Sequence, residues 1–172
     1  KSRVSRASMP PVEHVDAIVE GLLGAERPLI LLGNEAMRDE VSDEVMAIAE
    51  AVGAPVVTSW EMSMVYPTNH PSFAGSVLVQ DPELPRRADV LWSLGGHMFK
   101  RPKNEGVVVG RAAKIFHTGQ DWTEVARNYP VDSAALANIR TTAAAVLAAL
   151  RAQDLDTPSP RARRQRLQDY AA

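Results

Sequence analysis

The chain of 172 residues contains no cysteine, few aromatic residues and no long apolar run. Without cysteine it can form neither a disulfide nor a thiolate metal site, and it has no cysteine nucleophile. With aromatic residues at 5%, its core must be built mainly from aliphatic side chains. No apolar run approaches the roughly 18 residues of a membrane-spanning helix, and the basic, polar N-terminus does not resemble a secretory signal. We expect a cytoplasmic protein with no membrane contact.

Charge is distributed unevenly along the chain. The total is −2, while residues 1–10 carry +3 and residues 151–172 carry +2, so the body at 11–150 carries −7. An acidic body argues against a nucleic-acid surface. The basic C-terminal run could contact phosphates, but a solvated linker or a helix packed on another domain is the simpler explanation. Because the first residue is Lys1 and not methionine, we expect a piece of a longer polypeptide.

The stretch at residues 25–34 organises the chain. Pro28 begins an element, the next four residues are all apolar, and Gly33 and Asn34 turn the chain. A short run that is apolar on both faces is typical of a strand buried inside a parallel sheet. A strand, a glycine turn and a following helix form the first half of a nucleotide-binding type of βαβ unit.

Short apolar runs alternate with helical patterns along the rest of the chain. This alternation predicts an α/β fold, a Rossmann-like three-layer sandwich with a mostly parallel sheet and helices on both faces. The predicted strands span residues 29–32, 54–58, 89–94, 113–117 and, at the edge, 131–136, and the predicted helices span 12–25, 36–52, 139–151 and 161–170. Residues 59–75 read as an irregular loop. We divide the chain into an N-terminal linker (1–11), a central domain (12–152) and a basic C-terminal linker or helix (153–172).

Two glycine turns are candidates for a ligand site. Gly33 follows the first strand but stands alone, without a GxGxxG pattern, and Glu35 would repel a pyrophosphate; a plain turn capped by Asn34 or Glu35 is the simpler interpretation. Gly95 and Gly96 end the third strand, and ligands of open α/β sheets bind at the carboxyl ends of strands. The neighbouring cations that could neutralise a phosphate are Lys100, Arg101 and Arg111.

No pattern in the chain predicts catalysis or metal binding. The four histidines lack an HxH or i,i+4 spacing, so a metal site is not expected. No serine lies in a GxSxG elbow, and the acidic residues are spread over helix faces. His70 and His117 are better explained as hydrogen-bonded structural or interface residues than as general bases.

Four landmarks, in order, resemble the central domain of the thiamine-diphosphate-dependent decarboxylase and acetolactate synthase family. They are AERPLILLG at 25–33, AEAVGAPVVT at 49–58, YPTNHPSFAG at 66–75 (similar to Pro-x-x-His-Pro-x-x-x-Gly), and ADVLWSLG at 88–95 followed by KIFH at 114–117 and NYPVD at 128–132. Together they cover about residues 15–150. The resemblance implies a six-stranded parallel sheet, with flanking domains of the same polypeptide that supply a catalytic glutamate and the motif for Mg²⁺ and thiamine diphosphate. It also implies a homo-oligomer, a dimer or a tetramer.

Some members of this family hold FAD or ADP in this domain, and here the chain departs from their pattern. Where they show Gly-x-Arg-Phe after the third strand, this chain has Gly95, Gly96, His97 and Met98. Where they show His-x-Asp-x-Asp, it has Gly119 in place of the first acid, and only Asp121 remains. We therefore predict a vestigial nucleotide site built from Gly33, Asn34, Gly95, Gly96, His97 and Asp121, with no catalytic residue and no cofactor in this segment.

Three hypotheses follow. In the first, the chain is a non-catalytic scaffold within a thiamine-diphosphate enzyme that cleaves or forms C–C bonds on a 2-oxo acid or a similar acyl donor. In the second, it is a module that retains FAD or ADP, with Lys100 and Arg101 beside the Gly95–His97 turn. A free-standing dehydrogenase or deacetylase is the third, and it is disfavoured because its glycine fingerprint and catalytic histidine motif are missing.

Overall fold

The computed structural model describes residues 8–59, 66–76, 83–96, 98, 109–153 and 158–171. Within these ranges it contains six strands and six helices. In chain order they are α1 (Val12–Gly24), β1 (Pro28–Leu32), α2 (Asn34–Arg38), α3 (Ser42–Val52), β2 (Val56–Thr58), β3 (Phe73–Ser76), α4 (Leu84–Arg87), β4 (Val90–Leu94), β5 (Lys114–Gly119), β6 (Ser133–Leu136), α5 (Ile139–Ala152) and α6 (Pro160–Ala171). None of the helices in these ranges is long and apolar enough to cross a membrane.

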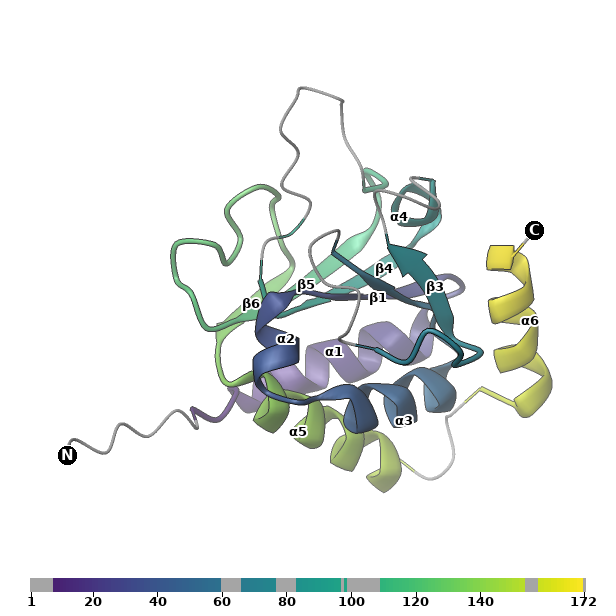
Figure 1. Cartoon of the computed structure of the whole chain (residues 1–172), viewed down its shortest axis with the longest axis horizontal. Helices are drawn as coiled ribbons and strands as arrows, with labels where there is room; N and C mark the ends of the chain where they lie inside the picture. The colour runs from purple at the N-terminus through teal and green to yellow at the C-terminus, as the bar shows by residue number, and fades with distance from the viewer. Residues whose placement is uncertain are drawn as a thin grey trace.

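The six strands form one sheet in the order β3-β2-β1-β4-β5-β6, and every neighbouring pair is parallel (Figure 1). β1 and β4 lie at its centre, and the chain order reverses between them. In doubly wound sheets this reversal opens a crevice at the carboxyl ends of the two strands. The predicted α/β, Rossmann-like fold is confirmed, and with it the central place of the first strand.

β1 is buried along its whole length because it has apolar side chains on both faces of the sheet. Ile30 and Leu32 belong to the cluster on one face, and Leu29 and Leu31 belong to the cluster on the other. All four are at most 2% exposed. The continuous apolar run is thus the sequence signature of a strand covered on both sides.

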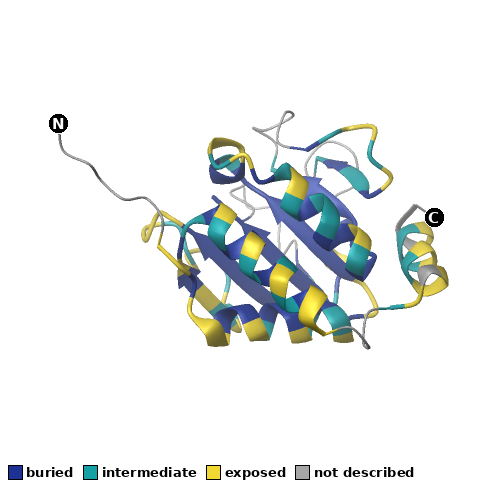
Figure 2. Cartoon of the chain, turned by 90° about the horizontal axis from the view of Figure 1, so that it is seen from below, coloured by how far each residue is buried: buried dark blue, intermediate teal, exposed yellow. Residues whose placement is uncertain are grey.

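The two faces of the sheet are covered differently. α1, α3 and α5 lie side by side on one face, with their apolar stripes turned towards the strands and their charged sides exposed (Figures 1 and 2). The other face is covered by the short α4 and by irregular segments that contribute Met98, Val109 and Val131. Helices therefore lie on both faces, as predicted, but the second face has much less helix among the described residues.

The predicted helix at 36–52 is two helices. α2 ends at Arg38, the chain turns through Asp39, Glu40 and Val41, and α3 begins at Ser42. Glu40 has φ 51°, a left-handed conformation that interrupts the helix. The stop after the second helix is as predicted, since Gly53 takes φ 70° at its C-terminus.

The break between α2 and α3 places Asp39 where its carboxylate ties three elements together. Asp39 Oδ2 accepts hydrogen bonds from Asn138 Nδ2 (2.9 Å) and Ile139 N (3.1 Å) at the start of α5. The same oxygen accepts one from Gln120 Nε2, at 2.6 Å, in the segment after β5. A carboxylate at a helix N-terminus is stabilised by the unpaired amides and the helix dipole.

β3 was not predicted from the sequence. Residues 59–75 were expected to form a loop, whereas Phe73–Ser76 pairs in parallel with β2 as an edge strand. With only four residues and no apolar run, it lacks the pattern that marks β1. Residues 60–65 of the predicted loop lie outside the described residues.

The predicted C-terminal helix is present as α6, and it packs on α3 of the same chain. Arg163 and Arg166 donate hydrogen bonds to the carbonyl oxygens of Ala51 (3.3 Å) and Val52 (2.7 Å). A Cβ at Gly53 would lie 2.7 Å from the Arg163 Cα, so the glycine permits this close approach. The two guanidinium groups satisfy carbonyls that the helix end leaves unpaired.

Candidate functional site

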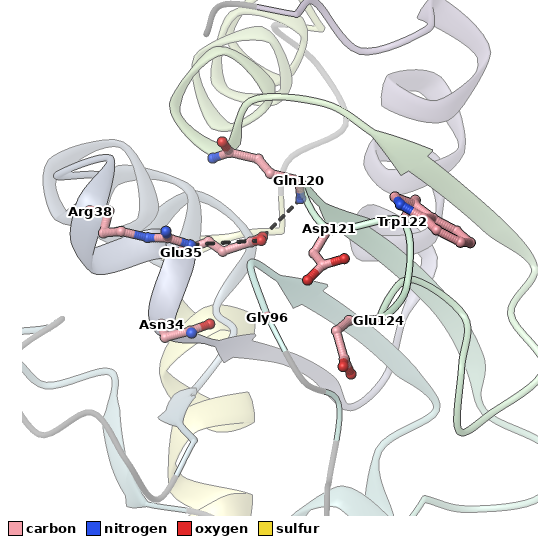
Figure 3. A pocket seen from close by; sticks show the side chains of 8 residues that line it. All are labelled: Asn34, Glu35, Arg38, Gly96, Gln120, Asp121, Trp122 and Glu124. Atoms are coloured by element: carbon pink, nitrogen blue, oxygen red, sulfur yellow. Dashed lines mark hydrogen bonds and ion pairs between the residues drawn. The ribbon is translucent and has the colours of Figure 1, made fainter.

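A cleft of about 360 Å³ lies at the carboxyl ends of β1, β4 and β5, beside the point where the strand order reverses. Its walls come from three segments, each of which directly follows a strand or opens the next helix (Figure 3). The residues that line it are Asn34, Glu35, Arg38, Gly96, Gln120, Asp121, Trp122 and Glu124. The position is the one where open α/β sheets bind ligands.

The glycines after β1 and β4 pack directly on each other. A Cβ at Gly33 would overlap the carbonyl oxygen of Gly95, and a Cβ at Gly96 would overlap Asn34 Oδ1. Gly95 and Gly96 have φ 79° and 117°, conformations that favour glycine. These positions are glycines because the two turns pack backbone against backbone. This packing explains the glycines without any phosphate approaching the backbone.

Glu35 closes the inner wall of the cleft. It is 4% exposed, and its Oε2 accepts a hydrogen bond from the Gln120 backbone amide at 2.9 Å. Its Oε1 lies 4.0 Å from an Arg38 guanidinium nitrogen (Figure 3). The predicted capping role is wrong, because Gly33 is the N-cap of α2 and no side chain caps it.

The Asp121 carboxylate is hydrogen-bonded within the turn after β5. Its Oδ1 accepts hydrogen bonds from Thr123 N (2.9 Å) and Thr123 Oγ1 (2.7 Å), an arrangement typical of an Asx turn. Glu124 is held by Arg127 at 2.7 Å. Trp122, between them, is 77% exposed at the mouth of the cleft.

The cleft is acidic. Three carboxylates line it, from Glu35, Asp121 and Glu124, against a single guanidinium from Arg38. This surface would repel a diphosphate. Two backbone amides of the glycine turns are already hydrogen-bonded within the protein: Gly33 N donates to Leu94 O at 3.0 Å, and Gly95 N donates to Thr118 O at 2.8 Å. The described residues therefore do not fit the phosphates of FAD or ADP.

Two buried histidines lie on opposite faces of the sheet near the end of β5. His117 Nε2 is 3.2 Å from Gly96 O, and its Nδ1 is 3.1 Å from Ala126 N. His14 from α1 lies 2.7 Å from Ser133 Oγ and 2.9 Å from Thr118 Oγ1. Burial, with repulsion from His117 as a smaller cause, lowers the pKa of His14 to about 4. Burial also lowers the pKa of His117.

A second polar cluster lies between α3 and the segment before β3. Ser72 Oγ is 2.6 Å from Tyr66 Oη and 2.8 Å from His70 Nδ1, and His70 Nε2 is 3.2 Å from Glu50 Oε1. Ser72, His70 and Glu50 are linked in a row of hydrogen bonds, as in a serine–histidine–acid triad. Ser72 is only 2% exposed, however, so it cannot contact a substrate as a nucleophile would. Burial raises the pKa of Tyr66 to about 12. The predicted structural roles of His70 and His117 agree with these contacts.

The structure brings most of the predicted site residues together. Asn34, Gly96 and Asp121 line the cleft, and Gly33 and Gly95 form the contact behind it. His97, Lys100 and Arg101 lie outside the described residues. Arg111 does not line the cleft, because it precedes β5 and lies at the opposite, amino edge of the sheet.

Several lining residues were not predicted as part of the site: Arg38, Gln120, Trp122 and Glu124. The sequence could have indicated them only by position: Gln120, Trp122 and Glu124 closely follow β5, and Arg38 lies one helical turn after Asn34. Among the described residues, no group of three histidine or acidic side chains could hold a metal ion.

Residues 15–150 match the family described as "Thiamine pyrophosphate enzyme, central domain". The chain belongs to this family. A sulfoacetaldehyde acetyltransferase from Alcaligenes xylosoxydans xylosoxydans is 32% identical to this central domain over 118 residues, 64% of the chain and 20% of the relative. An acetolactate synthase from Mycobacterium avium is 25% identical over 136 residues, 76% of the chain and 22% of the relative.

The fold agrees with solved structures, among them a thiamine diphosphate-dependent 4-hydroxybenzoylformate decarboxylase from Rhodococcus jostii RHA1, with a TM-score of 0.73 at 21% identity over 92% of this chain and 29% of that chain. Benzoylformate decarboxylase from Polynucleobacter necessarius matches with a TM-score of 0.77 at 16% identity, over 93% of this chain and 30% of that chain. The central domain thus spans about a fifth of the length of the two curated relatives named above. The family assignment confirms the first of the three hypotheses as to the kind of domain. The alternative of an FAD- or ADP-holding module receives no support from these comparisons.

Proposed function

We propose that this chain is the non-catalytic scaffold of a thiamine-diphosphate-dependent enzyme, placed between two domains that bind the cofactor. The observation that carries the proposal is the match over residues 15–150 to a domain that forms only about a fifth of each of those two relatives. The flanking domains of the same polypeptide would supply thiamine diphosphate, Mg²⁺ and the catalytic glutamate. The described residues offer no comparable set of metal ligands.

The reaction of the whole protein is the cleavage or formation of a C–C bond on a 2-oxo acid or a similar acyl donor. The names of the relatives, acetolactate synthase and sulfoacetaldehyde acetyltransferase, support this class. The protein works in the cytoplasm as a homodimer or homotetramer. The loop before β3 contributes to the substrate entrance, and the bonds of Ser72 to Tyr66 and His70 fix its C-terminal part.

The cleft at the switch point is a nucleotide site that has lost its ligand. Its acidic lining and the glycine contact between the β1 and β4 turns support this interpretation. Glu35 holds the Gln120 amide, a donor that an anionic or hydroxyl-bearing ligand could otherwise use. The residual site consists of Gly33, Asn34, Gly95, Gly96, His97 and Asp121.

Thiamine diphosphate binding tests the scaffold role. Titration calorimetry with thiamine diphosphate and Mg²⁺ should give no saturable heat with the 172-residue chain. A longer gene product that includes the segments on both sides should bind the cofactor and turn over a 2-oxo acid. The proposal fails if the 172-residue chain alone binds thiamine diphosphate and releases CO₂ from pyruvate.

A further inference from the structure

The buried side chain of His117, on β5, contacts both walls of the cleft. It is 1% exposed, with one ring nitrogen 3.2 Å from the Gly96 carbonyl oxygen and the other 3.1 Å from the Ala126 backbone amide. Gly96 belongs to the wall that follows β4, and Ala126 belongs to the segment at 120–127 that forms the opposite wall. One imidazole therefore connects two loops, one after β4 and the other after β5.

The partners of this imidazole determine where its proton is. A backbone amide can only donate, so Nδ1 of His117 must offer its lone pair to Ala126 N. A carbonyl can only accept, so Nε2 must carry the hydrogen that is donated to Gly96 O. Only the neutral ring with its proton on Nε2 satisfies both contacts. A proton on Nδ1 would place two N–H groups against each other.

We propose that neutral His117 is a pin that holds residues 120–127 against the Gly96 turn, and that protonation of Nδ1 opens this wall of the cleft. Ala126 has φ 57°, a left-handed conformation that non-glycine residues rarely adopt. The hydrogen bond to His117 is one of the contacts that hold it there. Once the bond is lost, Ala126 can relax to an ordinary conformation and move away from the ring.

The charged groups around His117 set the direction of the effect. Glu124 acts on it from the 120–127 segment, and His14, which contacts Thr118 from α1 on the other face of the sheet, acts on it electrostatically. Glu35 Oε2 and His117 Nε2 both lie within 4 Å of the position that a Gly119 Cβ would take. Burial is the largest influence and lowers the pKa of His117 below 6.5, partly opposed by the bond to Gly96 and by Glu124. The pin is therefore closed at neutral pH and opens in acid.

The other end of the segment is held independently. The carboxylates of Glu35 and Asp39 accept hydrogen bonds from the backbone and the side chain of Gln120. Acid can weaken these carboxylate contacts as well, so a test must separate them from the histidine. Two substitutions at position 117 do this, because each retains one of its two hydrogen bonds.

His117→Asn places an amide oxygen near the position of Nδ1, so it can accept from Ala126 N but cannot take up a proton. His117→Gln extends its amide nitrogen towards Gly96 O and leaves Ala126 N without its acceptor. Hydrogen exchange of residues 120–127, corrected for the intrinsic effect of pH, is measured for all three proteins from pH 7.5 to pH 4. Amides of β1 report on global unfolding in the same experiment.

The wild-type segment should lose at least tenfold in protection as the pH falls, while β1 stays protected. In His117→Asn the protection should be nearly independent of pH, and in His117→Gln it should be low throughout. The proposal is overturned if His117→Asn opens in acid as the wild type does, because the carboxylates would then be the cause. It is equally overturned if wild-type protection does not change.

A second readout needs no variant and applies even if both substitutions prevent folding. Nitrogen-15 NMR of the wild-type imidazoles should show Nδ1 of His117 unprotonated at pH 7.5. On acidification, Nδ1 should gain its proton over the same pH range in which the Ala126 amide resonance shifts. A proton on Nδ1 at pH 7.5, or a titration that leaves the Ala126 amide unmoved, contradicts the pin.

Discussion

The glycines at the carboxyl ends of β1 and β4 have a packing role at the scale of single residues. Gly33 faces the Gly95 carbonyl so closely that no Cβ can be placed between them. In nucleotide-binding sheets a glycine at this turn lets a pyrophosphate approach the backbone. Here the neighbouring turn occupies the space, so a substitution should damage the fold whether or not a ligand is present.

Gly33→Ala should lower the free energy of unfolding by about 3 kcal/mol or prevent folding, because the methyl group overlaps backbone that cannot move aside. Urea denaturation followed by circular dichroism measures the change. Gly24→Ala is the matched control, since a Cβ there meets nothing within 4 Å. Its stability should stay the same or rise by up to about 1 kcal/mol. Equal urea midpoints for the two variants would show that the contact between the turns is not close.

His14 makes the stability of the chain depend on pH. Its pKa is about 4 in the folded state and 6.5 in a model peptide. Above pH 6.5 it is neutral in both the folded and the unfolded chain and has no effect. As the pH falls from 6.5 towards 4, the unfolded chain binds the proton first, and roughly 3 kcal/mol of stability is lost.

His14→Gln should remove this part of the pH dependence. Urea unfolding at pH 7.5, 5.5 and 4.5 compares the two proteins, and the variant should lose less stability than the wild type at each step below pH 6.5. The variant loses packing and hydrogen bonds as well, so it is the difference between pH values that decides. Parallel losses in the two proteins would mean that His14 is protonated without cost.

The site could be predicted from the sequence only as far as its residues follow strands. Asn34 and Gly96 were identified because they follow strands whose carboxyl ends meet at one edge of a sheet, and Asp121 was identified through the family resemblance. The bonds from Glu35 and Asp39 to Gln120 join residues more than 80 positions apart in the chain. No local pattern encodes such a pairing, which is why the acidic wall of the cleft became visible only in the structure.

At the scale of elements, the break between α2 and α3 is the main departure from prediction. Residues 36–52 contain a helical pattern with no proline or glycine, so one helix was expected. Tertiary contacts overrode this preference: Asp39 must reach the start of α5, and Glu40 turns left-handed to allow it. β1 and β4 were well predicted because they are buried, mainly apolar runs, whereas the short edge strand β3, which has no such run, was missed.

Glu40→Gly should stabilise the chain by about 1 kcal/mol, because glycine adopts φ 51° without strain. Glu20→Gly, within α1 and also exposed, is the matched control. There the same change should destabilise by about 1 kcal/mol, since glycine weakens a helix interior. Thermal unfolding of both variants gives the two signs. A loss of stability at Glu40 would mean that this residue is not held in the left-handed conformation.

At the scale of the whole molecule, one sheet carries the family resemblance and also forms the cleft at its carboxyl edge. The strand order with its reversal between β1 and β4 is that of a dinucleotide-binding fold. The ordered landmarks at 25–33, 49–58, 66–75 and 88–95 allowed the family to be identified from the sequence, and the match over residues 15–150 confirms it. The cleft that the sheet provides is lined by acids.

A binding measurement with FAD and ADP tests the central claim most directly. Each nucleotide is titrated into the 172-residue chain in a calorimeter at neutral pH and moderate salt. The account predicts no saturable heat for either, with any affinity weaker than about 1 mM. Stoichiometric binding of FAD or ADP in the micromolar range would contradict it, and would show that the cleft remains a working nucleotide site.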